Sequence, residues 1–442
     1  MLSQDNNSTF NYGTYNKIRE DKNYPFVSPF FLDNSKLNKI NKNNELIFNA
    51  NFESGNLDIA QKYSYCEYDL YIKPDPSTNN NKQGHRVWFY FQIKNAERNQ
   101  RVILNIVNIS KAKMALYRKG ATPVVKSDKR PKWVRLPKDT VFLHRSNRHK
   151  KNYILSIAFC FDDPDDTYYF AFSFPYTYTQ LQNYLKILEE QNFPFLKRSF
   201  IGYSIEKKRI DLLTISNIEN LSKPRKKKMV CITSRVHPGE SPSSYVCEGL
   251  INFLVSNDPI AKILRDNLIF KIIPCLNPDG VYHGNYRTCT LGYDLNRNWL
   301  NPQINLHPTI YYAKKLILSF KDKEEIDLNI YIDIHAHSTL MNGFIYGNVP
   351  DDDENKYNST LSTISFPTLF NTKAKDFSLN NTIYNKDPVK AGTGRRTLGE
   401  ILDDNSNCYT LEVSFFFQTD PETNECVPYT IEKCNYKNKY II

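Results

Sequence analysis

The hydrophobic pattern of the chain changes near residue 175, and this change constrains the fold more than any other feature. Over residues 44–175, short aromatic and β-branched runs such as Val87–Ile93, Val102–Ile106 and Tyr153–Phe161 are separated by polar turns. Strands at this spacing without intervening helices are typical of a sandwich of two sheets. This region is therefore predicted to be a small antiparallel β-sandwich. Residues 1–43, which are polar and rich in asparagine, are predicted to be a loosely docked extension.

After residue 176, strand-like and helix-like patterns alternate. Thr177–Gln191 and Pro308–Phe320 carry apolar residues at helical intervals, whereas Met229–Thr233, Leu268–Ile273 and Leu328–Ile334 are continuous apolar runs. Alternation of this kind predicts an α/β domain over residues 176–442, with a mixed, mostly parallel sheet flanked by helices. Functional side chains in such sheets gather at the carboxyl ends of the strands.

The composition excludes several classes of protein. A hydrophobic content of 40% over 442 residues is enough to bury cores, so global disorder is excluded. The nine cysteines form no Cys-x-x-Cys pair or dense framework, and no segment has the roughly 20 apolar residues of a membrane span. The amino-terminal residues carry no apolar signal segment, so we expect a soluble, cytoplasmic protein without a membrane partner.

The net charge of +11 suits an anionic partner, although dispersed lysines alone would also produce it. The basic run Lys223–Lys228 lacks interleaved aromatic residues and a recognisable nucleic-acid module. We therefore interpret this run as a solvated loop and expect no nucleic-acid partner.

A set of potential metal ligands follows the predicted strands. His237 and Glu240 stand three apart in RVHPGES, and His335 and His337 follow an apolar strand in YIDIHAHS. Two histidines and one carboxylate form a ligand set that suits a catalytic Zn²⁺ with one open position. His335 and His337 are two residues apart in a strand and can point the same way, so the spacing leaves the choice between them open.

The sequence also contains candidates for the other polar residues that a hydrolytic site needs. Asp294 is the candidate to accept a hydrogen bond from the first histidine, and Glu412 in CYTLEVSF is the candidate general base. Arg287 could stabilise an oxyanion. Asn296 and Arg297 offer an amide and a guanidinium that can hold a terminal carboxylate. Together these residues predict a zinc peptidase that cuts from a carboxyl end.

The chain resembles the cytosolic carboxypeptidases, zinc metallocarboxypeptidases that remove glutamates from polyglutamylated proteins such as tubulin. The resemblance covers about residues 44–435 and is most similar to the branch of cytosolic carboxypeptidase 6, which shortens linear glutamate chains. The matching segments are RVHPGESPSSYVCEGLINFLVS, FKIIPCLNPDGVYHGNYRTCTLGYDLNRNW, YIDIHAHSTLMNGFIYGN, VKAGTGRRTLGEIL and CYTLEVSF.

The resemblance implies one Zn²⁺ per chain, bound by His237, Glu240 and His335. It implies the same roles as above for Arg287, Asn296, Arg297 and Glu412. Glutamate selectivity further implies a basic pocket, for which Arg395 or Arg396 in GTGRRT is the candidate.

Two segments depart from the family pattern. The segment FFFQ, residues 415–418, follows the candidate base where relatives often carry other residues, and we expect it to alter the pocket wall. The chain also stops at Ile442, where related domains continue into a longer helix, which we expect to affect stability more than chemistry.

Two other functions compete with a deglutamylase. One is a catalytically inactive microtubule-binding or scaffold protein on the same fold, and the other is a hydrolase of small acylated amino acids. The presence of every metal and catalytic side chain disfavours the first, and the NRNW segment with its arginine disfavours the second. The resemblance implies acidic polyglutamylated tails, above all those of tubulin, as partners, with microtubules, centrioles or cilia as cellular sites. The sequence contains no signal for an oligomeric state.

Overall fold

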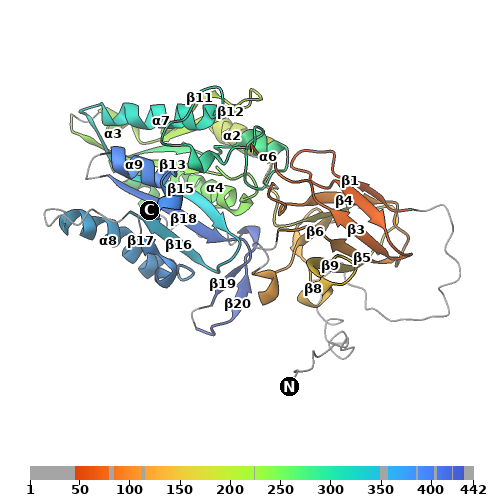
Figure 1. The fold of residues 1–442 in the computed structure, drawn as a ribbon. Coiled ribbons are helices and arrows are strands. Elements are labelled where there is room, and N and C mark those ends of the chain that lie inside the picture. The colour runs from red at the N-terminus through yellow and green to blue at the C-terminus, as the bar shows by residue number, and fades with distance from the viewer. Residues whose placement is uncertain are drawn as a thin grey trace, which may run out of the picture.

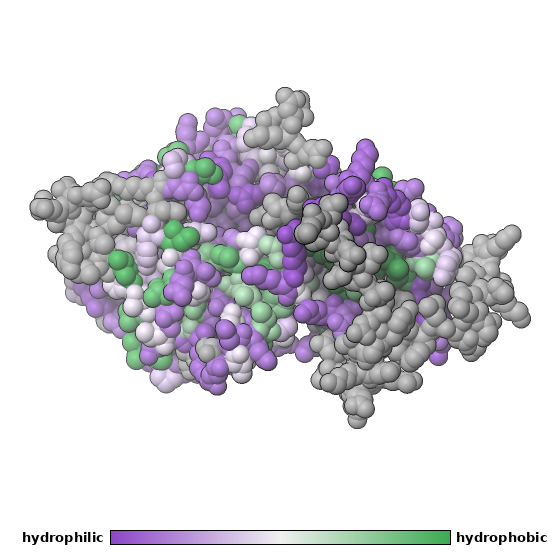
Figure 2. Space-filling model, turned by 60° about the horizontal axis from the view of Figure 1, so that its bottom comes forward, coloured by the Kyte–Doolittle hydropathy of each residue, from purple (hydrophilic) through white to green (hydrophobic). Residues whose placement is uncertain are grey.

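The computed structural model of the chain describes residues 45–78, 84–110, 115–222, 224–348, 357–384, 387–402, 406–420 and 422–432, without the side chains of 357–362. The predicted extension, residues 1–43, and the carboxyl-terminal residues 433–442 lie outside these ranges. The described chain forms two lobes, a β-rich one coloured orange to yellow and an α/β one coloured green to blue (Figure 1). Figure 2 shows one face of the molecule, on which hydrophilic residues surround smaller groups of apolar ones. Among the described residues we find no helix with both the length and the apolar character that a membrane span needs.

Two five-stranded sheets build the first lobe. One has the strand order β1-β4-β10-β6-β7, and the other has the order β2-β3-β5-β9-β8. The strands of the first sheet are β1 (Ile47–Asn49), β4 (Tyr90–Lys94), β10 (Tyr168–Ala171), β6 (Val124–Ser127) and β7 (Val134–Arg135). Those of the second are β2 (Ile59–Lys62), β3 (Glu67–Tyr71), β5 (Arg101–Ile106), β9 (Asn152–Cys160) and β8 (Val141–Ser146).

One strand pair of the sandwich differs from the prediction. β3 and β5 run parallel, whereas the remaining pairs of the described sandwich are antiparallel. Between them the chain passes through β4 in the other sheet, so it returns to the second sheet in its original direction. Alternation of apolar and polar residues reports which face of a strand is buried, not the direction in which the strand runs.

An eight-stranded sheet forms the centre of the second lobe, with the order β11-β12-β14-β13-β15-β18-β16-β17. Its strands are β11 (Leu196–Tyr203), β12 (Arg209–Ile215), β14 (Leu268–Ile273), β13 (Lys227–Ser234), β15 (Ile326–His337), β18 (Asn407–Ser414), β16 (Gly343–Gly347) and β17 (Ile383–Tyr384). The four central strands β14, β13, β15 and β18 are parallel to one another, as predicted for an α/β domain. Antiparallel pairings of β12 with β14 and of β16 with β18 make the sheet mixed.

Helices cover both faces of this sheet. α4 (Ser241–Val255) packs on one face, where Val246, Leu250 and Leu254 join the core with Ile232 and Ile332. The opposite face is covered by α7 (Pro308–Lys321) and α9 (Gly394–Ile401), which share a second core cluster with β13 and β15. The other described helices are α2 (Tyr178–Glu190), α3 (Ile218–Ser222), α5 (Pro259–Asn267), α6 (Pro278–Tyr282) and α8 (Tyr357–Lys373).

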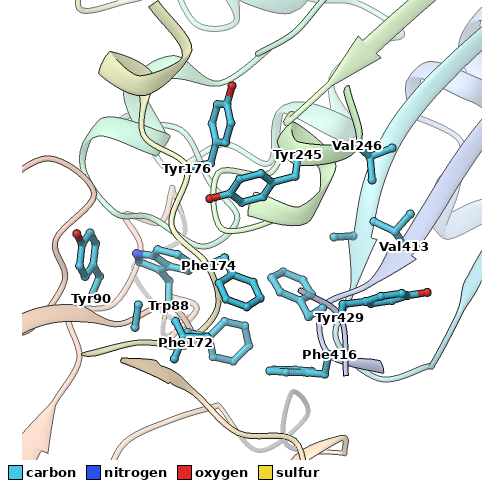
Figure 3. Packing of buried hydrophobic residues seen from close by; sticks show 14 of the residues in the cluster. Trp88, Tyr90, Phe172, Phe174, Tyr176, Tyr245, Val246, Val413, Phe416 and Tyr429 are labelled. Atoms are coloured by element: carbon cyan, nitrogen blue, oxygen red, sulfur yellow. The ribbon is translucent and has the colours of Figure 1, made fainter. Parts of the chain in front are cut away.

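Aromatic side chains join the two lobes. Phe172 follows β10 of the sandwich, and its ring lies 5.4 Å from that of Phe415. The rings of Phe172 and Phe416 lie 5.5 Å apart (Figure 3). Phe416 also contacts Tyr117 of the sandwich, at 5.5 Å between ring centroids. Phe415 and Phe416 of the FFFQ segment therefore pack toward the sandwich, and none of the four residues lines the cavity described below. Our expectation that it alters the pocket wall was wrong.

Candidate zinc site and substrate pocket

The predicted site residues meet where the central strands end. β13 leads into the segment that carries His237, and Glu240 is the N-cap residue of α4. His335 lies near the end of β15, directly opposite Glu412 of β18 in the register of this parallel pair. All four residues line one cavity of about 180 Å³. The fold thus brings together residues that are far apart in the sequence at the carboxyl edge of the sheet.

Three side chains converge as a metal site would require. The Nδ1 atom of His237 lies 2.8 Å from Oε1 of Glu240, and Nδ1 of His335 lies 2.9 Å from Oε2 of the same carboxylate. One donor atom from each residue lies within 4.8 Å of the others, and all three residues are buried. His337, the alternative ligand, also lines the cavity, but it is not one of these three residues, and its Nδ1 accepts a hydrogen bond from the backbone N–H of Thr339 at 3.1 Å.

A second carboxylate contacts the far nitrogen of each histidine. Nε2 of His237 lies 3.1 Å from Oδ1 of Asp294, which confirms the predicted pairing. Nε2 of His335 lies 2.8 Å from Oδ2 of Asp333, a contact that we did not predict. The spacing Asp-x-His within a strand was the available signal, because residues two apart share a face. Such outer carboxylates hold the imidazole tautomer that leaves Nδ1 free to bind a metal.

The charges within this group stabilise one another. Burial alone would raise the pKa of Glu240, but the two histidines hold it well below its usual range. Burial would lower the pKa of His335, whereas Asp333 and Glu240 raise it well above the ordinary value. Asp294 has a lowered pKa because His237, Arg287 and Arg297 outweigh the effect of its burial. Glu240, the carboxylate of the proposed ligand set, and Asp294 beside it are therefore held in their ionised forms, and a carboxylate must be ionised to bind a metal.

The donor set fits Zn²⁺. Two imidazole nitrogens and one carboxylate are a common set of protein ligands in catalytic zinc sites, and they leave a coordination position for water or substrate. The two Nδ1 atoms face the same carboxylate while the two Nε2 atoms are held by aspartates. His237, Glu240 and His335 are therefore the residues that would hold the ion.

Glu412 lies at the border of the cavity. Its strand places it beside His335, and its side chain is partly exposed. Its carboxylate makes no hydrogen bond or ion pair with another described residue. A carboxylate that lies beside the metal ligands and is not bound to another described side chain is suited to take a proton from water.

Two predicted binding residues are tied to the metal site. Arg287 directs Nε and Nη2 at Oδ2 of Asp294, at 2.8 and 2.7 Å, so one aspartate holds both this arginine and His237. Asn296 lies with its amide nitrogen 3.1 Å from Nε2 of His335, while its oxygen accepts from the backbone N–H of Gly394 at 3.0 Å. Both residues line the cavity.

The remaining predicted arginines differ in position. Arg297 and Arg395 line the cavity, whereas Arg396 is not among the lining residues and pairs with Glu400 on α9 at 3.3 Å. Arg395 is 1% exposed, and its Nη1 donates to the backbone oxygen of Gly347 and to Oδ1 of Asn348, both at 2.6 Å. Burial lowers its pKa to about 10, so the guanidinium remains charged at neutral pH.

One cation of the cavity was missed in the sequence. Lys390 lies in the quoted VKAGTGRR segment, lines the cavity, and places Nζ 3.6 Å from the ring centroid of Tyr346. Burial, and then the charge of Arg395, lower its pKa. The proximity of this lysine to the arginine pair was the available signal, but its direction depends on the turn before α9.

Known proteins show the same organisation. A family model described as zinc carboxypeptidase matches residues 181–423, and one described as cytosolic carboxypeptidase N-terminal domain matches residues 48–172. Cytosolic carboxypeptidase 6 of Mus musculus is 52% identical over 391 residues, which cover 88% of this chain and 71% of the mouse protein. Cytosolic carboxypeptidase 6 of Caenorhabditis elegans is 47% identical over 389 residues, covering 87% of this chain and 83% of the nematode protein.

Solved structures agree with the fold. The metallo-carboxypeptidase of Burkholderia cenocepacia superposes with a TM-score of 0.74 at 23% identity, covering 90% of this chain and 97% of that chain. A metallo-carboxypeptidase of Pseudomonas aeruginosa gives a TM-score of 0.71 at 20% identity, covering 89% of this chain and 96% of that one. With the sandwich, the central sheet and the histidine–glutamate set in place, the chain belongs to the zinc carboxypeptidase family and, within it, to the cytosolic carboxypeptidases.

Proposed function

We propose that this metallocarboxypeptidase releases glutamate from the carboxyl ends of polyglutamate chains on acidic protein tails, including those of tubulin. The observation that carries the proposal is the charge of the cavity. Four cationic side chains line it, namely Arg287, Arg297, Lys390 and Arg395. The two carboxylates of the lining are Glu240, in the metal set, and Glu412, the candidate base. A pocket of this charge suits a residue with two negative groups of its own.

A carboxyl-terminal glutamate would occupy these cations in a consistent way. Its α-carboxylate suits Arg297, with Asn296 beside it, because a guanidinium can bind a carboxylate through two parallel hydrogen bonds. Its γ-carboxylate suits Arg395 and Lys390, two cations of the lining whose charges interact with each other. Arg287 then remains for the carbonyl oxygen of the bond that is cut. A terminal leucine would leave Arg395 with only its two neutral oxygen partners and no carboxylate to balance its buried charge, which is costly.

The residues of the chain can carry the proton transfers of peptide hydrolysis. Bound Zn²⁺ would supply an acidified water and polarise the carbonyl. Glu412 accepts the proton of the attacking water and delivers it to the leaving amine. Arg287 faces the oxygen on which negative charge develops, and Asp294 fixes the guanidinium in that position.

A second basic cavity supports an acidic tail as the partner. This cavity lies on the sandwich and has a volume of about 430 Å³. Its described lining residues include Arg86, Arg145 and Lys151 and no acidic side chain. With a net charge of +11, the protein would attract an acidic tail at a rate that falls with added salt. The relatives are named cytosolic, and the cytosol, with microtubules, centrioles or cilia as attachment sites, is the location that the proposal requires.

The test is glutamate release from a synthetic peptide that ends in an oligoglutamate tail. We would compare the zinc-loaded protein with Glu412→Gln, and the glutamate tail with the same peptide ending in leucine or lysine. The expected result is glutamate-selective release, reduced about a thousandfold by the substitution. Binding of the tail without release would instead support an inactive scaffold. Equal release of leucine would contradict the assignment of Arg395 while leaving the zinc mechanism intact.

A further inference from the structure

A carboxylate of the sandwich reaches the backbone beside the catalytic pocket. Asp75 lies between β3 and β4 and is 4% exposed. Its Oδ1 accepts the backbone N–H of Tyr286 at 2.8 Å, and its Oδ2 accepts those of Arg287 at 2.6 Å and Thr288 at 3.1 Å. Three consecutive peptide groups of the catalytic domain are thus held by one side chain of the other domain.

The surrounding contacts show that this junction is closely packed. The hydroxyl of Thr288 donates to the backbone oxygen of Pro76 at 2.8 Å. Gly292 has a φ of +83°, and a Cβ there would lie 2.8 Å from the backbone of Ser77. Burial raises the pKa of Asp75 to about 6, although the three N–H groups and Arg287 act to lower it. Burying a carboxylate costs free energy unless hydrogen bonds or opposite charges compensate it, and the three backbone N–H groups provide this compensation here.

The other side of the same tract contacts the metal site. The backbone oxygen of Tyr286 accepts the N–H of Gly239 at 2.8 Å, next to the ligand Glu240. A Cβ on Gly239 would lie 2.5 Å from the tyrosine ring. The guanidinium of Arg287 is meanwhile bound to Asp294. The backbone of residues 286–288 is therefore fixed between Asp75 on one side and the metal-binding loop on the other.

We propose that Asp75 is a positioning residue through which the sandwich fixes Arg287 against the carbonyl of the bond to be cut. Asp75 does not touch the substrate and acts through the backbone of residues 286–288. The inference rests on the oxyanion role of Arg287 in the function proposed above. It is independent of glutamate selectivity, because the carbonyl is common to every peptide substrate. The sandwich then contributes to catalysis indirectly, since without Asp75 the backbone of the arginine would lose one of the contacts that fix it.

The first variant to test is Asp75→Asn in the full, zinc-loaded chain. The amide replaces one oxygen by a donor that faces backbone N–H groups, so the tract must shift. Displacement of a catalytic group by about 1 Å can reduce a rate about a hundredfold, and we expect kcat to fall between about 10- and 100-fold. KM and zinc content should not change. The fall should be the same for peptides ending in glutamate and in leucine, even if the preference for glutamate proves wrong.

Ser54→Ala is the matched control. Ser54 is another buried residue of the sandwich that contacts the catalytic domain, where its hydroxyl donates to the backbone oxygen of Val281 at 2.7 Å. This variant should lower the melting temperature without lowering kcat. If Asp75→Asn behaves in the same way, with a lower melting temperature and normal kcat, the role of Asp75 is structural and the proposal is overturned.

A double-mutant cycle decides whether Asp75 acts through Arg287. In an Arg287→Ala background, adding Asp75→Asn should change kcat by less than about twofold, since the group that it positions is already gone. An equal loss in both backgrounds would overturn the proposal. Asp75→Glu keeps the charge while displacing the carboxylate, and it is to be carried through the same cycle if the asparagine variant does not fold.

Discussion

The two basic cavities of this protein hold their cations in different ways. In the catalytic pocket Arg395 is buried and bonded to two fixed oxygens at 2.6 Å, and Arg287 is bonded to Asp294. In the cavity of the sandwich, Arg145 and Lys151 are exposed to solvent. A buried cation with fixed partners can demand one geometry of its ligand, because water cannot replace a missing contact. An exposed cation attracts any negative charge, and salt screens it.

The comparison suggests a division of labour along an acidic tail. Under the proposed function, the catalytic pocket would select the terminal residue and the cavity of the sandwich would attract the tail. The two cavities should therefore respond differently to substitution, to the identity of the last residue and to ionic strength.

Among the substitutions that separate the two cavities, the largest effect is expected for Arg395→Ala. Loss of a buried charge pair with the γ-carboxylate should cost about 3 kcal/mol, which is roughly a 150-fold fall in kcat/KM for a peptide ending in glutamate. Release of a terminal leucine should not fall. Arg396→Ala is the matched control, because the neighbouring arginine pairs with Glu400 outside the cavity lining. Equal losses of kcat/KM in the two variants would mean that Arg395 does not bind the side chain of the terminal glutamate.

A smaller effect is expected for Asp333→Asn, which tests whether the buried network also fixes the metal. The substitution removes the charge beside Nε2 of His335, and outer-carboxylate changes of this kind weaken metal binding about 10- to 100-fold. Competition with a chelating dye would measure the zinc affinity. Asp327→Asn, at the opposite end of the same strand, should leave it unchanged. An unaltered affinity in the Asp333 variant would mean that the contact does not tune the ligand.

Much of the catalytic site could be predicted from the sequence because each functional segment follows a strong strand pattern. His237, His335 and Glu412 all lie at strand ends, and the parallel order of β13, β15 and β18 brings them to one edge. The pairing of Asp294 with His237 was predicted because a zinc-bound histidine usually contacts a carboxylate. The pairing of Asp333 with His335 was not predicted, although residues two apart in a strand share a face.

Contacts that depend on docking could not be predicted. The bonds of Asp75 to residues 286–288 join segments more than 200 positions apart, and no local pattern marks them. The same holds for the FFFQ segment, whose direction is set by the aromatic face of the sandwich. The choice between Arg395 and Arg396 depends on how α9 is rotated, because consecutive helical residues point about 100° apart.

The smallest effect is expected at the sandwich cavity, for Arg145→Glu. Reversing one exposed charge should raise KM for a long acidic tail by about three- to fivefold at low salt, since exposed charges act at long range and are screened. The difference should vanish near 0.5 M salt, and a short peptide should show none. Lys94→Glu, which makes the same charge change on an exposed residue of β4 outside the cavity, is the control. If both variants raise KM equally, attraction of the tail comes from the net charge of the sandwich and not from its cavity. The sandwich cavity would then have no separate role in binding the tail.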